Sequence, residues 1–307
     1  ILMATYHGEK YICRQLDSLL EQTYQDWHLW VQDDGSKDDT VSIVKAYIAR
    51  YPNKITLVKD NPHPKGAATN FFSLLPYTTR EYLFFCDQDD VWKKEKIAET
   101  INCFTQQERL HGKGFPMLIH TDLRVVDEQG KEIASSFMQY QGLKPQAASL
   151  GQLLCQNNIT GCTVAVNRAL LTAIGKDRIP EGLLMHDWWL GIGAAALGKV
   201  HFLKNQTVDY YQHGTNEVGA QKKHFLKSFL QALKHKEEMK EKIDATYRQA
   251  RSFYQSYEKV LPLEAKALIK EYGTLPQERK IKRIAKILKR SYKKQGFARV
   301  IGQLIYC

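Results

Sequence analysis

Three aspartates stand within four positions, at Asp87, Asp89 and Asp90, directly after the apolar run of residues 82–86. Carboxylates this close together repel one another unless a cation or hydrogen-bond donors offset their charge. Mg²⁺ and Mn²⁺ take one or two carboxylates together with the phosphate oxygens of a substrate. The spacing therefore indicates a divalent-metal site that handles phosphates, and the alternative is a solvated acidic turn before the next helix.

A second acidic cluster ends another apolar segment, at Asp33 and Asp34, and is followed by Gly35, which permits a tight turn. A carboxylate can accept a hydrogen bond from the ring N–H of uracil, thymine or guanine. We assign Asp34 to a ligand of this kind, and Asp38 or Asp39 to capping of the helix that follows. A capped turn without any ligand is the alternative.

Two further positions could take part in chemistry. Asp187 follows His186 and precedes Trp188 and Trp189. A carboxylate in partly apolar surroundings has a raised pKa and can serve as a general base, although a helix N-cap beside core tryptophans is the commoner explanation of such a sequence. His213 follows a predicted strand and could bind a metal or a diphosphate, whereas an ordinary loop histidine is the commoner case.

The elements that would position these residues alternate along the first 120 residues. Strands are predicted at residues 1–5, 27–31, 55–58, 82–86 and 117–121, with helical spacing of apolar residues between them. This alternation predicts an α/β fold with a mostly parallel sheet and helices on both faces. Ligands of such sheets bind at the carboxyl ends of the strands, where the acidic clusters fall.

The rest of the chain is less regular. Strands are predicted at residues 163–166, 200–203 and 207–211, and a helix at residues 183–197. Beyond them, helices are predicted at residues 222–257, 263–272 and 277–294. We therefore divide the chain into a main domain of residues 1–217 and a helical, basic extension of residues 218–307.

The charge of the chain is uneven. Ten of its 44 Lys and Arg residues lie between Arg279 and Arg299, whereas all 33 Asp and Glu residues lie at or before Glu278. The near-neutral main domain argues against a nucleic-acid binder, because phosphate backbones need cationic grooves. Six cysteines without a CxxC pair fit a reducing, cytoplasmic setting. We expect neither a signal peptide nor a membrane-spanning helix.

The predicted helix at residues 277–294 is amphipathic and basic. Its apolar face carries Ile281, Ile284, Ile287 and Leu288, and eight Lys or Arg residues surround that face. Such helices bind anionic membrane surfaces, at roughly 1 kcal/mol per cationic residue near the lipid. We expect docking on an anionic membrane. The alternatives are a basic helix packed on the domain and a helix that mediates oligomerisation.

Taken together, these motifs resemble glycosyltransferase family 2, which has the GT-A fold. The resemblance covers residues 1–217 and rests on the ordered segments at residues 1–6, 19–24, 32–36, 87–90, 161–163, 186–189 and 212–214. The later segments resemble the bacterial rhamnosyltransferase branch. Members of that branch build rhamnose-rich cell-wall polysaccharide or O-antigen from dTDP-L-rhamnose.

The resemblance implies roles for individual residues of the donor site. Thr5, Tyr6 and Asp34 would hold the nucleotide base, with the Tyr6 ring stacked on it. Asp87 would lie near the ribose and diphosphate, and Asp89 would ligate Mn²⁺ or Mg²⁺.

Other roles implied by the resemblance concern the reaction itself. Asp187 would be the catalytic base of an inverting transfer, and His213 would assist the diphosphate or the metal. Gln88 stands where many family members have a small residue or a serine, and no role is assigned to it.

We therefore expect metal-dependent, inverting transfer of L-rhamnose from dTDP-L-rhamnose to a growing, lipid-linked bacterial polysaccharide. The protein would be cytoplasmic and peripheral on the inner face of the plasma membrane. Another UDP- or dTDP-linked donor is an alternative. An inactive sugar-nucleotide-binding module and a nucleotidyltransferase are alternatives of other classes. An oligomer is compatible with the sequence.

Overall fold

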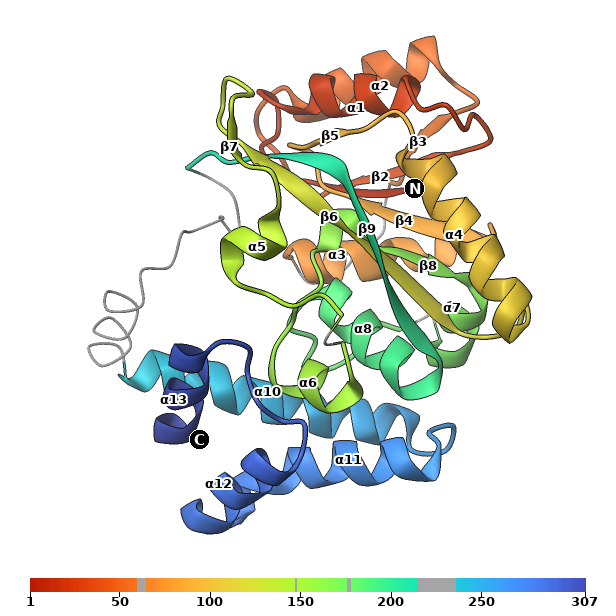
Figure 1. Ribbon diagram of the computed structural model, residues 1–307. Coiled ribbons are helices and arrows are strands. Elements are labelled where there is room, and N and C mark those ends of the chain that lie inside the picture. The colour runs from red at the N-terminus through yellow and green to blue at the C-terminus, as the bar shows by residue number, and fades with distance from the viewer. Residues whose placement is uncertain (60–64, 147, 176–177, 215–235) are drawn as a thin grey trace.

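The computed structural model describes residues 1–59, 65–146, 148–175, 178–214 and 236–307. Within these ranges nine strands form one sheet in the order β3-β2-β1-β4-β8-β6-β9-β5, with β7 beside β6 (Figure 1). The strands are β1 Leu2–Thr5, β2 Leu29–Asp33, β3 Ile55–Leu57, β4 Tyr82–Cys86, β5 Val91–Trp92, β6 Met117–Val126, β7 Glu132–Ala134, β8 Ala165–Asn167 and β9 Lys199–Tyr211. The expected α/β fold is confirmed.

The parallel arrangement belongs to one half of the sheet. Strands β3, β2, β1 and β4 pair in parallel, so their carboxyl ends meet at one edge. In the other half, β8 runs antiparallel to both β4 and β6, and β5 runs antiparallel to β9. The sheet as a whole is thus mixed.

Helices cover both faces of the sheet, and alternate residues of each strand feed two hydrophobic clusters. Met3 and Phe84 face one cluster, whereas Leu2 and Phe85 face the other. The helices before the C-terminal region are α1 Ile12–Leu20, α2 Thr40–Arg50, α3 Ala67–Leu74, α4 Lys96–His111, α5 Phe137–Gln141, α6 Leu150–Cys155, α7 Arg168–Ile174 and α8 His186–Leu197, with short 3₁₀ turns η1 Leu75–Tyr77 and η2 Gly161–Thr163.

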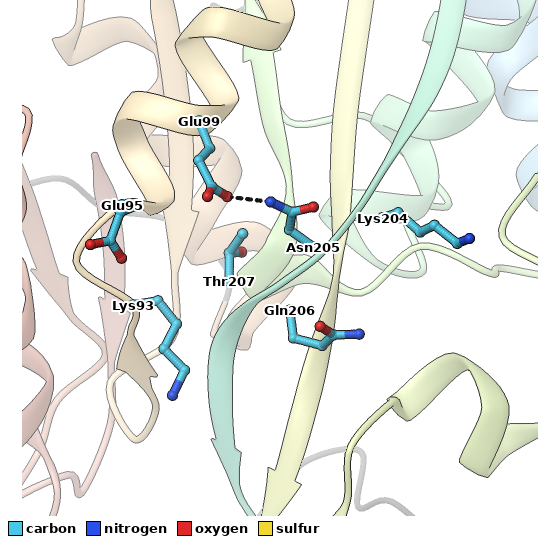
Figure 2. A pocket seen from close by; sticks show the side chains of 7 residues that line it. All are labelled: Lys93, Glu95, Glu99, Lys204, Asn205, Gln206 and Thr207. Carbon is cyan, nitrogen blue, oxygen red and sulfur yellow. Dashed lines mark hydrogen bonds between the residues drawn. The ribbon is translucent and has the colours of Figure 1, made fainter.

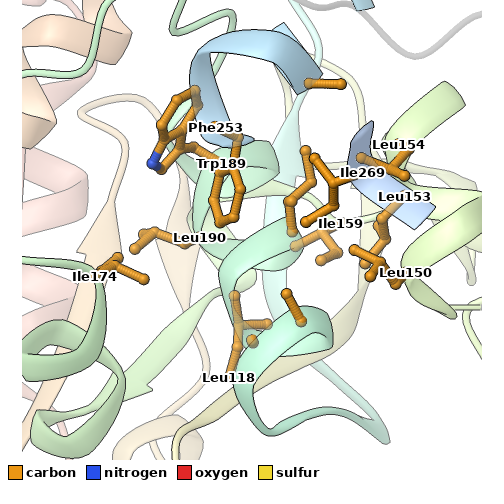
Figure 3. Packing of buried hydrophobic residues seen from close by; sticks show 14 of the residues in the cluster. Leu118, Leu150, Leu153, Leu154, Ile159, Ile174, Trp189, Leu190, Phe253 and Ile269 are labelled. Atoms are coloured by element: carbon orange, nitrogen blue, oxygen red, sulfur yellow. The ribbon is translucent and has the colours of Figure 1, made fainter. Parts of the chain in front are cut away.

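The C-terminal helices share a core with the sheet domain. They are α10 Lys236–Tyr257, α11 Leu263–Thr274, α12 Lys280–Lys289 and α13 Phe297–Tyr306, with η3 Leu275–Gln277 between α11 and α12. The rings of Trp189 on α8 and Phe253 on α10 lie 5.0 Å apart. Ile269 of α11 joins the same cluster (Figure 3). Residues 236–307 therefore form part of the packed body (Figure 1).

Several predicted bounds need correction. The two strands predicted at residues 200–203 and 207–211 are one long strand, β9, which continues through a register shift against β6. The helix predicted at residues 277–294 ends at Lys289, and a further helix, α13, follows it. Residues 222–235 of the long predicted helix, and the domain boundary at residue 217, lie outside the described residues.

The predicted apolar face of α12 is divided between core and solvent. Ile287 is fully buried against the domain, whereas Ile281 is 84% exposed. A basic helix packed on the domain was one alternative to membrane docking, and the burial of Ile287 fits that alternative. Among the helices that the structure describes, none has the length and apolar character needed to cross a bilayer.

Candidate active site

A cavity of about 1070 Å³ opens at the carboxyl ends of β1, β2 and β4. Its lining brings together six residues singled out from the sequence: Thr5, Tyr6, Asp34, Asp87, Asp89 and Asp187. The first five follow strand ends of the parallel half of the sheet, and Asp187 comes from the start of α8. Residues spread over more than 180 positions therefore face one space.

His213 does not line this cavity but lies directly behind its acidic side. The His213 Nε2 and an Asp89 carboxylate oxygen are 2.9 Å apart. The His213 ring also stacks on Tyr11, with centroids 4.2 Å apart and ring planes 12° from parallel. The residues predicted to serve a metal, Asp89 and His213, are therefore in contact, and α1 supports them through Tyr11.

A buried carboxyl lies beneath the same turn. Asp90 is 0% exposed, and among the residues that the structure describes its side-chain neighbour of hydrogen-bonding type is the Cys162 thiol, a weak donor. Burial raises the pKa of Asp90 well above its usual range, and the nearby charges of Asp89 and Asp87 act in the same direction. Ligand atoms of Asp87, Asp90 and Cys162 lie within 4.8 Å of one another. The turn therefore concentrates oxygen ligands at one point.

The carboxylates of Asp87 and Asp89 fit a hard divalent cation. Mn²⁺ and Mg²⁺ favour carboxylate oxygens, which Asp87 and Asp89 present at the cavity. Burial raises the pKa of the Cys162 thiol well above its usual range, so this sulfur does not offer a thiolate. Burial lowers the pKa of Lys96 to about 8, so the amine still carries its charge at neutral pH and offsets part of the negative charge of the carboxylates. A cation bound at the cavity would offset the remaining repulsion.

The two aspartates after β2 have different surroundings. Asp33 builds the turn: its carboxylate accepts from the Thr5 hydroxyl at 2.9 Å, and from the backbone N–H groups of Gly35 at 2.9 Å and Ser36 at 2.7 Å. Gly35 has a φ of 92°, a conformation that favours glycine. Asp34 instead lines the cavity and accepts from the backbone N–H of Gly66 at 2.8 Å. Of the two aspartates, Asp34 is therefore the one at the cavity, and its assignment to a ligand stays a prediction.

The predicted cap of α2 involves the first of the two candidate residues. The Asp38 carboxylate accepts from the Thr40 backbone N–H at 3.2 Å and from the Thr40 hydroxyl at 2.6 Å. Asp39 occupies the N-cap position, but its side chain makes no capping hydrogen bond. The Thr40 hydroxyl accepts in turn from the Gly8 backbone N–H, which ties α2 to the loop after β1.

Asp187 occupies the first turn of α8. It is 4% exposed, and its carboxylate accepts from the Trp188 backbone N–H at 2.6 Å. Met185 holds the N-cap position, so the alternative of Asp187 as the N-cap is wrong. Negative charge in this position interacts favourably with the positive end of the helix dipole.

The neighbouring His186 faces the hydrophobic core. Its ring lies 4.2 Å from that of Phe71 and 5.0 Å from that of Phe85, measured between centroids. Burial lowers the pKa of His186 to about 3, so the imidazole is neutral at neutral pH. His186 therefore packs the start of α8 against the core, and both His186 and Asp187 contribute to the lining of the cavity.

Gln88 has a clear structural role that the sequence did not indicate. Its side-chain amide accepts from the Tyr6 backbone N–H at 2.9 Å and donates to the Tyr6 carbonyl at 2.8 Å. A Cβ at Gly8 would lie 2.3 Å from the Gln88 side-chain oxygen, so a larger residue there would displace the Gln88 amide from its present position. The departure of Gln88 from the pattern of its relatives was the one available signal.

Other lining residues come from segments that sequence patterns left unassigned. Phe137 and Gln141 of α5, the stretch from Gln156 to Thr160, and Arg299 of α13 all face the cavity. These residues have no shared spacing or motif. They reach the cavity because the chain returns to it after β6 and again at its C-terminal end.

A second, smaller cavity of about 520 Å³ lies between the start of α4 and the middle of β9 (Figure 2). Its lining mixes cations such as Lys93 and Lys204 with Glu95 and Glu99. Lys93 is already paired with Asp209 at 2.6 Å. Because this cavity contains none of the residues singled out from the sequence, the larger cavity is the candidate active site.

Comparison with known proteins finds similarity to glycosyltransferases. Residues 1–111 match the family model described as Glycosyl transferase family 2. The dTDP-rhamnosyl transferase RfbG of Shigella flexneri is 27% identical over 229 residues, which are 71% of this chain and 74% of that protein. The Escherichia coli UDP-Glc:alpha-D-GlcNAc-diphosphoundecaprenol beta-1,3-glucosyltransferase WfgD is 28% identical over 171 residues, which are 56% of this chain and 60% of that protein.

Solved structures share the fold. S. aureus TarS residues 1–349, in complex with UDP, aligns with a TM-score of 0.54 at 16% identity, covering 94% of this chain and 71% of that one. The mannosyltransferase PcManGT of Pyrobaculum calidifontis, in complex with GDP-Man and Mn²⁺, aligns with a TM-score of 0.51 at 15% identity, covering 99% of this chain and 85% of that one. The architecture is therefore that of GT-A glycosyltransferases.

Proposed function

We propose that this chain, a glycosyltransferase of family 2 with the GT-A fold, performs an inverting, metal-dependent transfer of a sugar from a nucleotide donor to a bacterial glycan. The observation that carries the proposal is the convergence of Asp34, Asp89 and Asp187 on one cavity. Such a transfer requires a group that binds the nucleotide base, a group that binds the metal at the diphosphate, and a general base. Asp34, Asp89 and Asp187 are the candidates for these three roles.

For the donor we propose dTDP-L-rhamnose. The support is the likeness to a protein named as a dTDP-rhamnosyl transferase, together with the motifs of the rhamnosyltransferase branch. Another UDP- or dTDP-linked sugar is the second candidate, supported by the likeness to a UDP-Glc-dependent enzyme. In both cases Asp34 would accept from N3–H of the pyrimidine, and the exposed ring of Tyr6 would stack on it.

In the proposed mechanism the protein binds and orients the donor and the acceptor, and it moves one proton. Asp187 takes the proton from an acceptor hydroxyl, and that oxygen attacks the anomeric carbon from the face opposite the nucleotide. Asp89, with His213 behind it, would hold Mn²⁺ or Mg²⁺, and Asp87 would lie near the ribose and diphosphate. The metal would supply positive charge to the leaving diphosphate when bound. No covalent enzyme intermediate is needed, so no nucleophilic Ser or Cys takes part.

The test is a panel of dTDP-rhamnose, UDP-glucose, UDP-GlcNAc and GDP-mannose, each with Mn²⁺ and with EDTA. We expect metal-dependent release of dTDP, fastest from dTDP-rhamnose. Release of pyrophosphate would instead identify a nucleotidyltransferase. Thermal stabilisation by a sugar nucleotide with no release of nucleotide, in the presence of acceptor glycans, would identify an inactive binding module.

We further propose that the acceptor is a growing, lipid-linked polysaccharide and that the protein acts at the inner face of the plasma membrane. The support is the name of the E. coli relative, which specifies a diphosphoundecaprenol-linked acceptor, and the exposure of Ile281 and Phe297 beside a basic surface. Replacing the exposed Lys282 and Lys289 by Gln should weaken binding to anionic vesicles, and unchanged sedimentation with vesicles would contradict the proposal.

We keep residues 1–217 as the domain that binds and transfers the sugar, with residues 218–307 as its helical extension. Since Trp189 and Phe253 pack together across this division, the extension should not separate as an independent unit. Limited proteolysis followed by gel filtration tests this, because both fragments should stay associated after cleavage.

A further inference from the structure

Arg299 is the residue of the C-terminal helices that lines the candidate active site. It lies in the first turn of α13, and three backbone carbonyls hold its guanidinium group. The two terminal nitrogens donate to Gln141 O at 2.6 Å, to Gln295 O at 3.0 Å and to Gly142 O at 3.4 Å. The guanidinium is therefore fixed at the edge of the cavity rather than extended into solvent.

The segment before α13 is fastened to the same wall of the cavity. Gln295 is 6% exposed, and its backbone N–H donates to the Gln156 side-chain oxygen at 2.6 Å. Its side-chain amide donates to Lys144 O at 3.2 Å. Gln156 itself lines the cavity. The position of Arg299 is thus set by buried contacts on both sides.

The charge of Arg299 has no carboxylate partner within residues 1–59, 65–146, 148–175, 178–214 and 236–307. Burial lowers the pKa of Arg299, but a guanidinium keeps its proton in proteins. A half-buried cation without a counter-charge is costly, and an anionic group of a bound ligand would remove this cost.

The neighbouring wall of the cavity is neutral. The lining residues between Phe137 and Gly161 are apolar side chains, neutral amides, a threonine and a glycine. Apolar groups at Phe137, Leu143 and Trp188 suit the faces of sugar rings or an alkyl chain. This side of the cavity therefore offers one cation among uncharged groups, whereas the acidic groups come from the strand ends and from α8.

We propose that Arg299 binds a phosphate group of a diphosphate-linked acceptor, which makes α13 part of the acceptor site. The inference rests on the proposed function and concerns an acceptor at an early step of growth, when the reacting hydroxyl is still close to the lipid diphosphate. The donor diphosphate already has a place at the strand ends, near Asp87 and Asp89, so the cation on the wall of α5 and α13 is available to a second diphosphate. A planar guanidinium suits this role, because its N–H groups match the oxygens of a phosphate.

The experiment uses the full chain, saturated with UDP and Mn²⁺, and measures binding of geranyl diphosphate by calorimetry. Geraniol is the phosphate-free probe. Arg299→Gln is compared with Arg279→Gln, which removes the same charge from an exposed position outside the cavity. We expect geranyl diphosphate to bind about 10- to 100-fold more weakly to Arg299→Gln, the usual size of a charge-assisted hydrogen bond. UDP affinity and geraniol binding should be the same in all three proteins.

Each other outcome has a definite meaning. Equal affinity of Arg299→Gln and the unmodified protein for geranyl diphosphate would overturn the inference, as would absence of geranyl diphosphate binding to a protein that binds UDP. Weaker UDP binding in Arg299→Gln would assign the arginine to the donor diphosphate and also overturn it. If the unmodified protein fails to bind any nucleotide, the proposed function itself fails.

A second variant covers the case in which Arg299→Gln does not fold, since three carbonyls would lose a donor. Arg299→Lys keeps the charge and one hydrogen bond but loses the planar fork. It should bind geranyl diphosphate several-fold more weakly, with unchanged UDP affinity and a cooperative thermal transition. Unchanged affinity for geranyl diphosphate in this variant would overturn the inference.

Discussion

The side-chain amide of Gln88 makes two hydrogen bonds to the backbone of Tyr6. Its oxygen accepts the Tyr6 N–H at 2.9 Å, and its nitrogen donates to the Tyr6 carbonyl at 2.8 Å. The loop after β1 and the acidic turn after β4 are thereby locked together, although they lie 82 positions apart in the chain. Gln88 therefore positions both Tyr6, whose ring would stack on the nucleotide base, and the turn that carries the carboxylates of the proposed metal site.

Replacing Gln88 by Glu should loosen this support. An ionised carboxylate cannot donate to the Tyr6 carbonyl, and it adds negative charge beside Asp87 and Asp89. We expect the affinity for dTDP in calorimetry to fall about 10-fold, in keeping with the loss of one hydrogen bond. Gln129→Glu, at an exposed position, is the matched control. Equal dTDP affinity in Gln88→Glu and the control would show that the contact does not position the donor.

Asp187→Asn tests the proposed base. The amide oxygen can still accept from the Trp188 N–H, so the thermal transition should hardly move. Donor affinity should also persist, whereas turnover should fall by about 10²–10⁴-fold, the usual contribution of a positioned base. Weaker donor affinity with modestly changed turnover would indicate a binding role. Turnover within a few-fold of the unmodified enzyme would eliminate Asp187 as the base.

Asp89→Asn tests the proposed metal site. Replacing the carboxylate by an amide removes the charge that a divalent cation requires, and it alters the contact with His213. We expect loss of metal-dependent nucleotide release, while Asp26→Asn, at an exposed carboxylate, should behave as the unmodified enzyme does. Full turnover of the unmodified enzyme in EDTA would contradict a metal requirement.

Asp34 should set the preference for a pyrimidine nucleotide. Its carboxylate can accept from N3–H of thymine or uracil while the Gly66 N–H orients it. Calorimetry should give tighter binding of dTDP or UDP than of GDP, and Asp34→Asn should reduce that difference. Tighter binding of GDP by the unmodified protein would count decisively against this assignment.

The buried His120 should make the fold sensitive to acid. It is 0% exposed, and neither ring nitrogen has a hydrogen-bond partner in the described part of the chain. Burial lowers its pKa to about 3 from the ordinary 6.5. Between these pKa values the unfolded chain binds a proton that the native chain does not. The free energy of unfolding therefore falls as pH drops through this window, by at most about 1.4 kcal/mol per pH unit for each such histidine.

Replacing His120 by Phe should flatten this dependence. Guanidinium denaturation at pH 7 and pH 5 gives the slope of the unfolding free energy against pH for both proteins. The slope of the variant should be smaller by the contribution of about one proton. His186, whose pKa burial also lowers to about 3, would still contribute. His111→Phe, at an exposed position, is the matched control. An equal slope in His120→Phe would mean that His120 is protonated in the native state.

The sequence by itself determined the parallel half of the sheet and its acidic edge. Buried apolar runs such as Tyr82–Cys86, separated by helical periodicity, give parallel strands, and polar residues directly after such strands must lie at the ligand edge. Thr5, Asp34 and Asp87 could therefore be chosen from local patterns. The ligand role of Asp34 and the possible base role of Asp187 followed from residue chemistry, the resemblance made the roles of all four specific, and these roles stay predictions.

Only the tertiary structure decided which distant segments complete the cavity. Gln88 and Arg299 belong to no periodic pattern, because their positions depend on contacts with Tyr6 and with the wall around Gln141. The face of α12 is a similar case. Its spacing predicted one apolar stripe, but packing against the domain buries Ile287 and leaves Ile281 in solvent. Helical spacing fixes which residues share a face, whereas only packing decides what covers that face.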